Sequence, residues 1–266
     1  MRLGEPHPRW ERFDPRSVVW FLRVYGLALV IDVVTEIASG VWAVHAGHLY
    51  PWRSIAPLYP TWVLAIEWTL RAGGGLALAL AATRGTVVRH ASRVLAIVLL
   101  VALLERYSNH GVLLFLVAFY LQITRIETLA PDFEHTPQHG LGLVRAQLVL
   151  VYVFSALNKI THGFLSGHSL VNLLHGKLAA GPATALSWLV VAGELAIPLL
   201  LVRSPRFGVA AALVMHAAFT ALVPNVASFG LTMIAMALLF SRVPGAPSPW
   251  PSGHGDSGAR AAPPRT

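Results

Sequence analysis

The chain of 266 residues has no cysteine and few charged residues. Without a thiol it can form no disulfide, no thiolate nucleophile and no cysteine-ligated zinc or iron–sulfur site. Only 12% of the residues are charged and 55% are hydrophobic, whereas an ordinary soluble domain carries about a quarter charged residues. One soluble core of this size cannot bury so much apolar surface. The composition excludes an ordinary soluble enzyme and predicts an all-α integral membrane protein.

Eight apolar stretches approach the roughly 20 residues that a membrane-spanning helix needs. They cover residues 18–43, 62–83, 87–104, 110–125, 143–162, 183–203, 206–223 and 225–242. We therefore expect a bundle of about eight transmembrane helices within residues 17–242, although the third and fourth stretches also suit a re-entrant pair. Residues 1–16 are polar, and residues 243–266 are rich in proline, glycine, serine and alanine, which predicts a disordered tail.

Lysine and arginine are unevenly distributed along the chain. If the N-terminus is cytoplasmic, most of the 20 basic residues fall in or beside cytoplasmic segments, and only Arg53, Arg106 and Lys177 fall in outer loops. Cytoplasmic loops collect lysine and arginine in this way. We therefore expect a multi-pass protein of the cytoplasmic membrane with both termini inside. The same asymmetry accounts for the net charge of +8, so no nucleic-acid partner is expected.

Several ionisable side chains interrupt the apolar stretches. They are Asp32, Glu36, Glu67, Arg71, Lys159, Glu194 and His216. A charge in hydrocarbon costs roughly 3 kcal/mol on insertion scales, so each of these groups needs a partner or a function. With the orientation above, most of them lie in the outer half of the bundle, together with Asn109 and His110. We therefore expect a polar cavity that opens toward the outer face or the outer leaflet.

Sequence spacing predicts partners for some of these groups. Glu67 and Arg71 are four residues apart, which suits an ion pair within one helix. Asp32 and Glu36 have the same spacing but repel each other, so one is protonated or is matched by a cation from another span. For His216, a hydrogen-bonded packing role is the simpler alternative to catalysis.

Lys159 belongs to a polar stripe on an otherwise apolar helix. Arg145, Leu148, Tyr152, Ser155 and Lys159 follow steps of three and four, so they share one helix face. The simple alternative is a lysine whose amine reaches out to the membrane interface. A lysine held away from water is instead a suitable general base. Lys159 is therefore the main catalytic candidate.

Four separated segments resemble those of one family. RAQLVLVYVFSALNKITHGFLSGHSL, residues 145–170, contributes Gln147, Tyr152, Lys159, Phe164, Gly167 and Ser169. The others are WERFDPRSVVWFLRVYGLALVIDV, SNHGVLLFLVAFYLQI and MHAAFTALVPNVASFGLTMIAMALLF. In this order they resemble the membrane domain of the vitamin K-dependent γ-glutamyl carboxylases and their bacterial relatives, the horizontally transferred transmembrane (HTTM) domain proteins. The resemblance covers residues 10–242.

The resemblance implies an active site and a chemistry. Lys159 takes the place of the family's catalytic lysine, and Asn109 and His110 take those of its Asn-His pair. The pocket residues that we expect around the quinone are Tyr152, Ser155, Asn158, His216, Glu194 and Asp32. The implied cofactors are a reduced vitamin K-type quinone such as menaquinol, molecular oxygen and, for carboxylation, carbon dioxide, without a metal. The Lys159 amine and the His110 ring should then face one cavity within about 10 Å of each other, a span that a quinol head can bridge through hydrogen bonds.

The sequence also departs from the family. The family's paired lysine is Asn158–Lys159 here, and its usual tryptophan is Phe164. After the last span we expect no counterpart of the large lumenal β-rich domain of the carboxylases. Hydroquinone epoxidation is therefore the expected activity, whereas carboxylation of a secreted peptide or protein does not follow from the resemblance alone.

Two other functions compete with this interpretation. Two histidines three or four residues apart can bind a metal on one helix face. The sequence has two such pairs, His45 with His48 and His135 with His139. A separate group, His162, His168 and His175, lies in one loop. No HExxH motif occurs, so metal catalysis is the weaker hypothesis. A non-catalytic scaffold, a transporter or a maturation partner for a secreted peptide stays open as the alternative to an enzyme.

Overall fold

The computed structural model describes residues 12–39, 61–105, 108–124, 138–174, 176, 178–223 and 226–241. These residues form helices without any strand. The long helices are α1 (Pro15–Ala38), α3 (Thr61–Leu80), α4 (Gly85–Glu105), α6 (His139–Thr161), α8 (Ala180–Arg203) and α9 (Pro205–Leu222). The short ones are α5 (Asn109–Ile123), the 3₁₀ turn η4 (Phe164–Ser166), α7 (His168–Leu173) and α10 (Ala227–Leu238).

The expectation of an all-helical membrane protein is confirmed for the described residues. Six helices are long and apolar enough to cross a membrane, namely α1, α3, α4, α6, α8 and α9. α5 and α10 coincide with the fourth and eighth predicted spans, but they have only 15 and 12 residues. The protein is therefore a multi-pass membrane protein with six candidate spans and two shorter apolar helices beside them.

Local capping explains where two of these helices begin. Asp14 caps α1, because its carboxylate accepts from the Arg16 amide and the Ser17 hydroxyl, while Pro15 occupies the first helical position. Ser108 caps α5, with its hydroxyl oxygen accepting from the Gly111 amide at 2.9 Å. The Ser108 cap therefore sets the start of α5 at Asn109, directly before His110.

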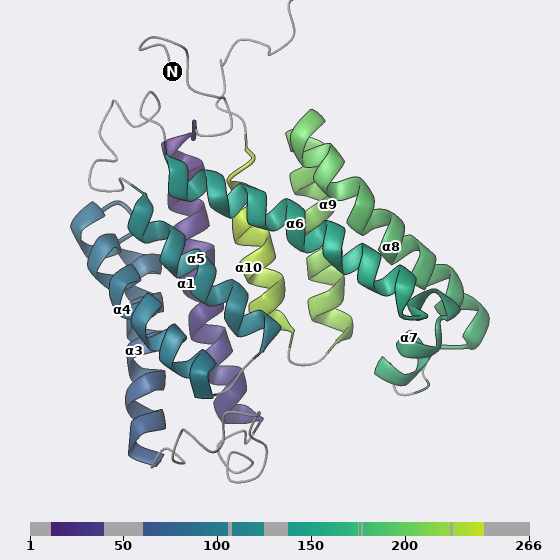
Figure 1. Ribbon diagram of the computed structural model, residues 1–266, viewed down its shortest axis with the longest axis horizontal. Coiled ribbons are helices and arrows are strands. Elements are labelled where there is room, and N and C mark those ends of the chain that lie inside the picture. The colour runs from purple at the N-terminus through teal and green to yellow at the C-terminus, as the bar shows by residue number, and fades with distance from the viewer. Residues whose placement is uncertain are drawn as a thin grey trace, which may run out of the picture.

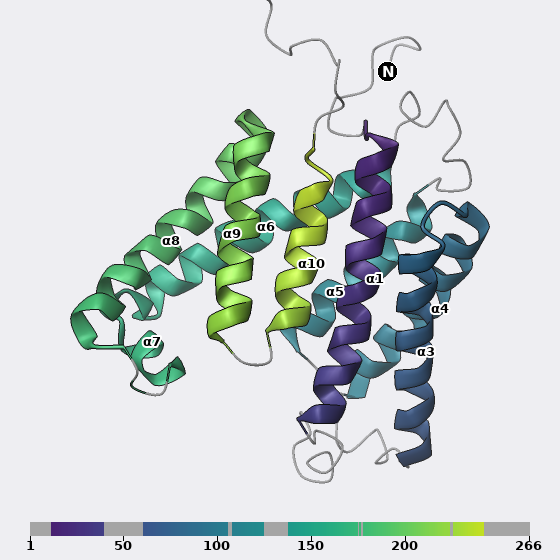
Figure 2. The ribbon, with the colours of Figure 1, turned by 180° about the vertical axis from the view of Figure 1, so that it is seen from behind.

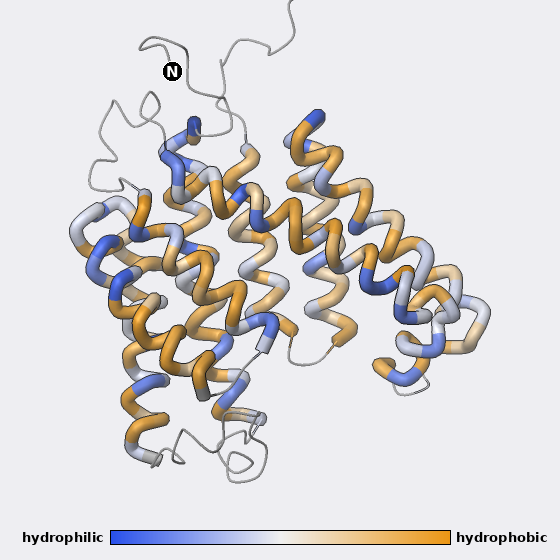
Figure 3. The backbone as a smooth tube through the Cα atoms, viewed as in Figure 1, coloured by the Kyte–Doolittle hydropathy of each residue, from blue (hydrophilic) through white to orange (hydrophobic). Residues whose placement is uncertain are grey.

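The helices run alternately up and down and form two groups, which meet through α10 and through the contact of α5 with α6 (Figures 1 and 2). One group holds α1, α3, α4 and α5, and the other holds α6, α7, α8 and α9. α10 lies between them and packs against α1, α9 and α6. Most residues along the helices are hydrophobic (Figure 3). Large apolar side chains such as Trp188, Phe207 and Val214 remain exposed. These surfaces suit contact with lipid.

Glycine permits the close crossing of α1 and α3. A Cβ added at Gly26 would collide with the Gly75 carbonyl oxygen and the Ala79 amide nitrogen. A Cβ at Gly75 would in turn meet the Gly26 carbonyl oxygen, whereas one at Gly73 would meet nothing within 4 Å. Small residues allow membrane helices to approach in this way. The crossing brings the acidic residues of α1 up to α3.

Candidate functional site

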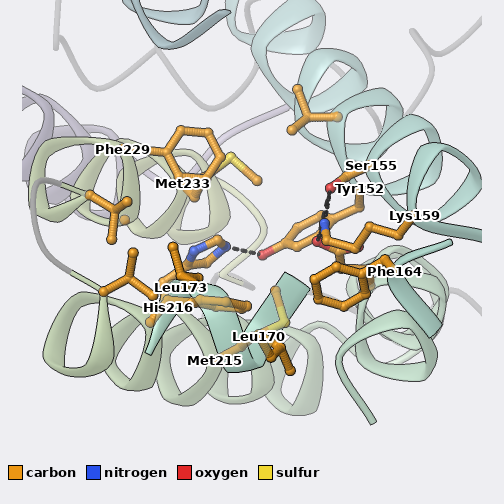
Figure 4. Close-up of a pocket in the computed structure, with 16 residues that line it drawn as sticks. Tyr152, Ser155, Lys159, Phe164, Leu170, Leu173, Met215, His216, Phe229 and Met233 are labelled. Carbon is orange, nitrogen blue, oxygen red and sulfur yellow. Dashed lines mark hydrogen bonds and ion pairs between the residues drawn. The ribbon is translucent and has the colours of Figure 1, made fainter. Parts of the chain in front are cut away.

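A cavity of about 310 Å³ lies between α6, α7, α8, α9 and α10. Most of its lining is apolar and comes from all five helices and η4. Phe164, Leu170 and Leu173 cover one side, and Met215, Phe219, Phe229 and Met233 cover others. Its polar lining consists of Tyr152, Ser155, Lys159, Glu194 and His216. We call this cavity the pocket (Figure 4).

The polar stripe predicted on α6 supplies three of these polar groups. Tyr152, Ser155 and Lys159 lie on the face of α6 that turns toward the pocket. Arg145, at the other end of the stripe, is buried away from the pocket. Its guanidinium lies 3.9 Å from the centre of the Phe13 ring, and its Nε donates to the Leu239 carbonyl at 2.9 Å. One helix face therefore serves the pocket at one end and anchors the end of α10 at the other.

Lys159, Glu194 and Ser155 form a compact triangle at the pocket wall. Lys159 Nζ lies 2.6 Å from Glu194 Oε1 and 2.5 Å from Ser155 Oγ, and the Ser155 hydroxyl donates to Glu194 Oε1 at 2.9 Å. The Lys159 side chain is 21% exposed, compared with 7% for Glu194. An ammonium has three N–H groups, of which Glu194 and Ser155 accept two. The third is available for a molecule in the pocket.

Tyr152 and His216 form a second polar pair in the pocket. The Tyr152 hydroxyl lies 2.8 Å from His216 Nε2, and both side chains are buried. His216 Nδ1 and Glu194 Oε2 have no hydrogen-bond partner among the described residues. Unsatisfied buried polar atoms are costly in a low-dielectric interior. A polar ligand or a rearrangement near these atoms would therefore be stabilising.

A separate cluster surrounds Arg71 in the other group of helices, where it is 3% exposed. Its guanidinium bonds to Asp32, to Glu36 at 3.0 Å and to Glu67 at 3.0 Å. The predicted Glu67–Arg71 pair is confirmed. Of the two alternatives for Asp32 and Glu36, protonation or a cation from another span, the structure shows the second, since Arg71 of α3 contacts both carboxylates. The Trp68 indole also donates to Glu36 at 2.8 Å. We call these residues the Arg71 cluster.

His110 joins the Arg71 cluster through Asp32. Its Nε2 lies 3.0 Å from Asp32 Oδ1 and 2.9 Å from Ser228 Oγ, and the Ser228 hydroxyl donates to the same Asp32 oxygen at 2.9 Å. The three residues meet at one imidazole nitrogen. A nucleophilic Ser-His-Asp relay uses both nitrogens, so this triangle is not such a relay.

The structure divides the predicted site residues between two places. Five of them meet in the pocket, namely Lys159, Tyr152, Ser155, Glu194 and His216. Asp32 and His110 meet in the Arg71 cluster.

His110 does not line the pocket, so the expected single cavity shared with Lys159 is not found. The Phe229 ring, which does line the pocket, contacts His110 and His216 edge to face with centroids 5.9 Å away in each case. Asn109 and Asn158 are exposed and do not line the pocket.

Sequence reasoning missed Ser228 and Phe229 as members of the site. Both lie in the segment ASFGLT at the start of α10, where they look like ordinary residues of an apolar helix. Metal binding gains no support, since the described residues contain no group of three or more His, Asp or Glu side chains able to hold an ion. His45, His48, His135 and His175 lie outside the described residues.

No family model matches the chain, and neither a curated protein nor a solved structure is similar to it. The likeness to the carboxylases and HTTM proteins therefore rests on the four motifs in the sequence, and the pocket is the structural feature that points to a function.

Proposed function

We propose that the protein is a membrane enzyme that oxidises a reduced vitamin K-type quinone, such as menaquinol, with molecular oxygen. The observation that carries the proposal is the Lys159–Glu194 ion pair at the wall of an otherwise apolar pocket between helices of membrane-spanning length. An ion pair in such surroundings is expensive to maintain, so a functional role is the default hypothesis. The charge asymmetry of the sequence supports a cytoplasmic membrane location with both termini inside.

The shape and chemistry of the pocket support a ligand with a polar ring and an apolar body. Its volume of about 310 Å³ lies at the small end of the range of about 300–1,000 Å³ found for ligand pockets. Phe164, Phe219, Met215 and Met233 offer aromatic and polarisable surfaces to a flat ring. Lys159 offers an N–H to a ring oxygen. The apolar tail of the quinol would lie among the helices and the lipid.

The Lys159–Glu194 pair can take the first hydroxyl proton of the hydroquinone. The short Nζ–Oε1 separation of 2.6 Å allows the ammonium to pass a proton to Glu194 while it accepts one from the ring hydroxyl. The proton then rests on Glu194, and the restored ammonium stabilises the ring oxyanion. The apolar walls exclude water, which strengthens this interaction. Ser155 holds both partners in place.

The overall reaction is balanced without a metal. One hydroquinone and one molecular oxygen give one quinone epoxide and one water. Oxygen dissolves in the bilayer and can reach the pocket from the lipid. Addition of carbon dioxide to a glutamate of a secreted peptide is the coupled step that the resemblance implies.

Epoxide formation by the purified protein tests the proposal. The protein in lipid nanodiscs is mixed with a reduced menaquinone and oxygen, and the epoxide is measured by mass spectrometry. We expect Lys159→Ala and Glu194→Gln to lower the rate by about a hundredfold or more, the range typical of a lost acid–base group. Arg93→Ala, on the exposed face of α4, is the control and should keep the rate of the unaltered protein.

Two results would count against the enzyme. A rate equal to that of empty nanodiscs would favour the scaffold, the transporter or the maturation partner. A rate that Lys159→Ala leaves unchanged would place any oxidation outside the pocket.

A further inference from the structure

Lysine is rare in this chain. Of the 20 basic residues, 18 are arginines and only two, Lys159 and Lys177, are lysines. Both residue types carry one positive charge, but only a lysine amine can give up its proton and act as a nucleophile. An arginine would pair with Glu194 at least as well. The proton transfer proposed above uses one property of the Lys159 amine, and its nucleophilicity is the other.

The groups around the Lys159 amine suit the formation of a carbon–nitrogen bond. Glu194 Oε1 lies 2.6 Å from Nζ and can take a proton from the ammonium. Glu194 Oε2 is buried and has no hydrogen-bond partner among the described residues, so the carboxylate can still accept from a hydroxyl. The centre of the Phe164 ring lies 5.6 Å from Nζ. A carbonyl group in the pocket would therefore meet a nucleophile, a proton carrier and an aromatic surface together.

The buried charge of Glu194 selects the class of carbonyl compound. Acylation of Lys159 would give a neutral amide and leave the Glu194 carboxylate, whose side chain is 7% exposed, without a cation. Condensation with an aldehyde gives an iminium, which keeps the positive charge and the pairing with Glu194. The mostly apolar lining of the pocket disfavours an aldehyde that carries a charge of its own. The fitting partner is therefore an aldehyde with an apolar body.

We propose that the pocket binds an apolar aldehyde covalently, as a protonated Schiff base on Lys159 with Glu194 as its counter-ion. Lysines in apolar pockets form Schiff bases with carbonyl compounds, and ionisable groups inside membranes serve as counter-ions of bound ligands. This activity is separate from the proposed quinol oxidation, because it needs neither a quinol nor oxygen.

The condensation is balanced with the groups of the pocket. The Lys159 ammonium passes a proton to Glu194, the amine adds to the carbonyl carbon, and a proton moves from the nitrogen to the former carbonyl oxygen. Glu194 then gives its proton to the new hydroxyl, which leaves as water while the nitrogen lone pair forms the C=N bond. One aldehyde and one ammonium thus give one iminium and one water, and Glu194 ends as a carboxylate.

Two aldehydes test the site in the full-length protein. 2-Naphthaldehyde is flat and apolar, whereas glyoxylate carries a carboxylate. Each is added to the protein in phosphatidylcholine nanodiscs, whose lipid has no primary amine, and borohydride reduces any Schiff base to a stable amine. Peptide mass spectrometry gives the labelled fractions of Lys159 and of Lys177, the internal control. We expect 2-naphthaldehyde to label Lys159 at least about tenfold more than Lys177, because the pocket holds it beside the amine, and glyoxylate to show no such preference.

A variant that fills the pocket tests where the aldehyde binds. Met233 lines the pocket, so Met233→Trp should lower the labelling of Lys159 by 2-naphthaldehyde to the level of Lys177. Phe207→Trp, at a side chain that is 72% exposed on α9, is the matched control and should leave the preference unchanged.

The absorption spectrum before reduction tests the counter-ion. A protonated aromatic Schiff base absorbs at longer wavelength than an unprotonated one. We expect the protonated band in the unaltered protein at neutral pH and its loss in Glu194→Gln. Glu36→Gln, which removes a carboxylate of the Arg71 cluster outside the pocket, should keep the band.

Three results would overturn the aldehyde site. They are labelling of Lys159 no stronger than that of Lys177, a preference that Met233→Trp leaves unchanged, and an unprotonated Schiff base in the unaltered protein. The epoxide assay would still stand on its own in each case. Absence of epoxide would in turn leave the labelling result as it is, so the two proposals fail separately.

Discussion

The Lys159–Glu194 pair should be coupled energetically, and a double-mutant cycle can measure the coupling. Lys159→Met leaves the Glu194 carboxylate, whose side chain is 7% exposed, with only the Ser155 hydroxyl. Removing one partner of a buried pair typically costs 3–5 kcal/mol. Because Lys159 is 21% exposed and partly screened, we expect a loss of about 3 kcal/mol, at the low end of that range.

The other two variants of the cycle should lose less free energy of unfolding than Lys159→Met. Glu194→Leu leaves a lysine in the last turn of α6, whose long stem can carry the amine to the membrane interface. We expect this variant to lose about 2 kcal/mol, because the remaining amine reaches the interface, and the double variant Lys159→Met with Glu194→Leu to lose about 2 kcal/mol, because it leaves no unpaired charge. The coupling energy is then about 3 kcal/mol.

Reversible unfolding in mixed micelles by added dodecyl sulfate, followed by circular dichroism, gives these free energies. Arg93→Met, which removes an exposed cation, is the control and should change stability by less than about 0.5 kcal/mol. A coupling energy below that size would refute the reasoning. It would mean that the two groups do not depend on each other in the folded protein.

Three other perturbations test the fold. Arg71→Lys should lose about 2 kcal/mol in the same unfolding assay, because an ammonium cannot reproduce the planar fork that reaches three carboxylates; equal stability would contradict that role. Gly26→Leu should destabilise the α1–α3 crossing by several kcal/mol, while Gly73→Leu, with open space, should be nearly neutral. The chain has no cysteine, so Ser39→Cys and Ser204→Cys each introduce a single thiol that reports on the orientation of the protein in the membrane. With both termini cytoplasmic, a membrane-impermeant maleimide added to intact cells should label only Ser39→Cys. Labelling of only Ser204→Cys would show that the orientation is the reverse.

The sequence determined which stretches form helices and which of them are apolar enough to enter a membrane. Both properties are local, since hydropathy and spacing along one helix do not depend on which helix packs against which. The face of α6 that carries Tyr152, Ser155 and Lys159 followed from steps of three and four. The Glu67–Arg71 pair followed from the same rule.

Only the tertiary structure decided which groups meet across helices. Glu194 pairs with Lys159 and Asp32 with Arg71 because helix crossings, such as the one at Gly26, set the distances between residues far apart in the chain. Hydropathy carries no information on those crossings. For the same reason no pattern in the sequence indicates that the Phe229 ring both lines the pocket and contacts His110, since the position of one aromatic ring depends on the side chains packed around it.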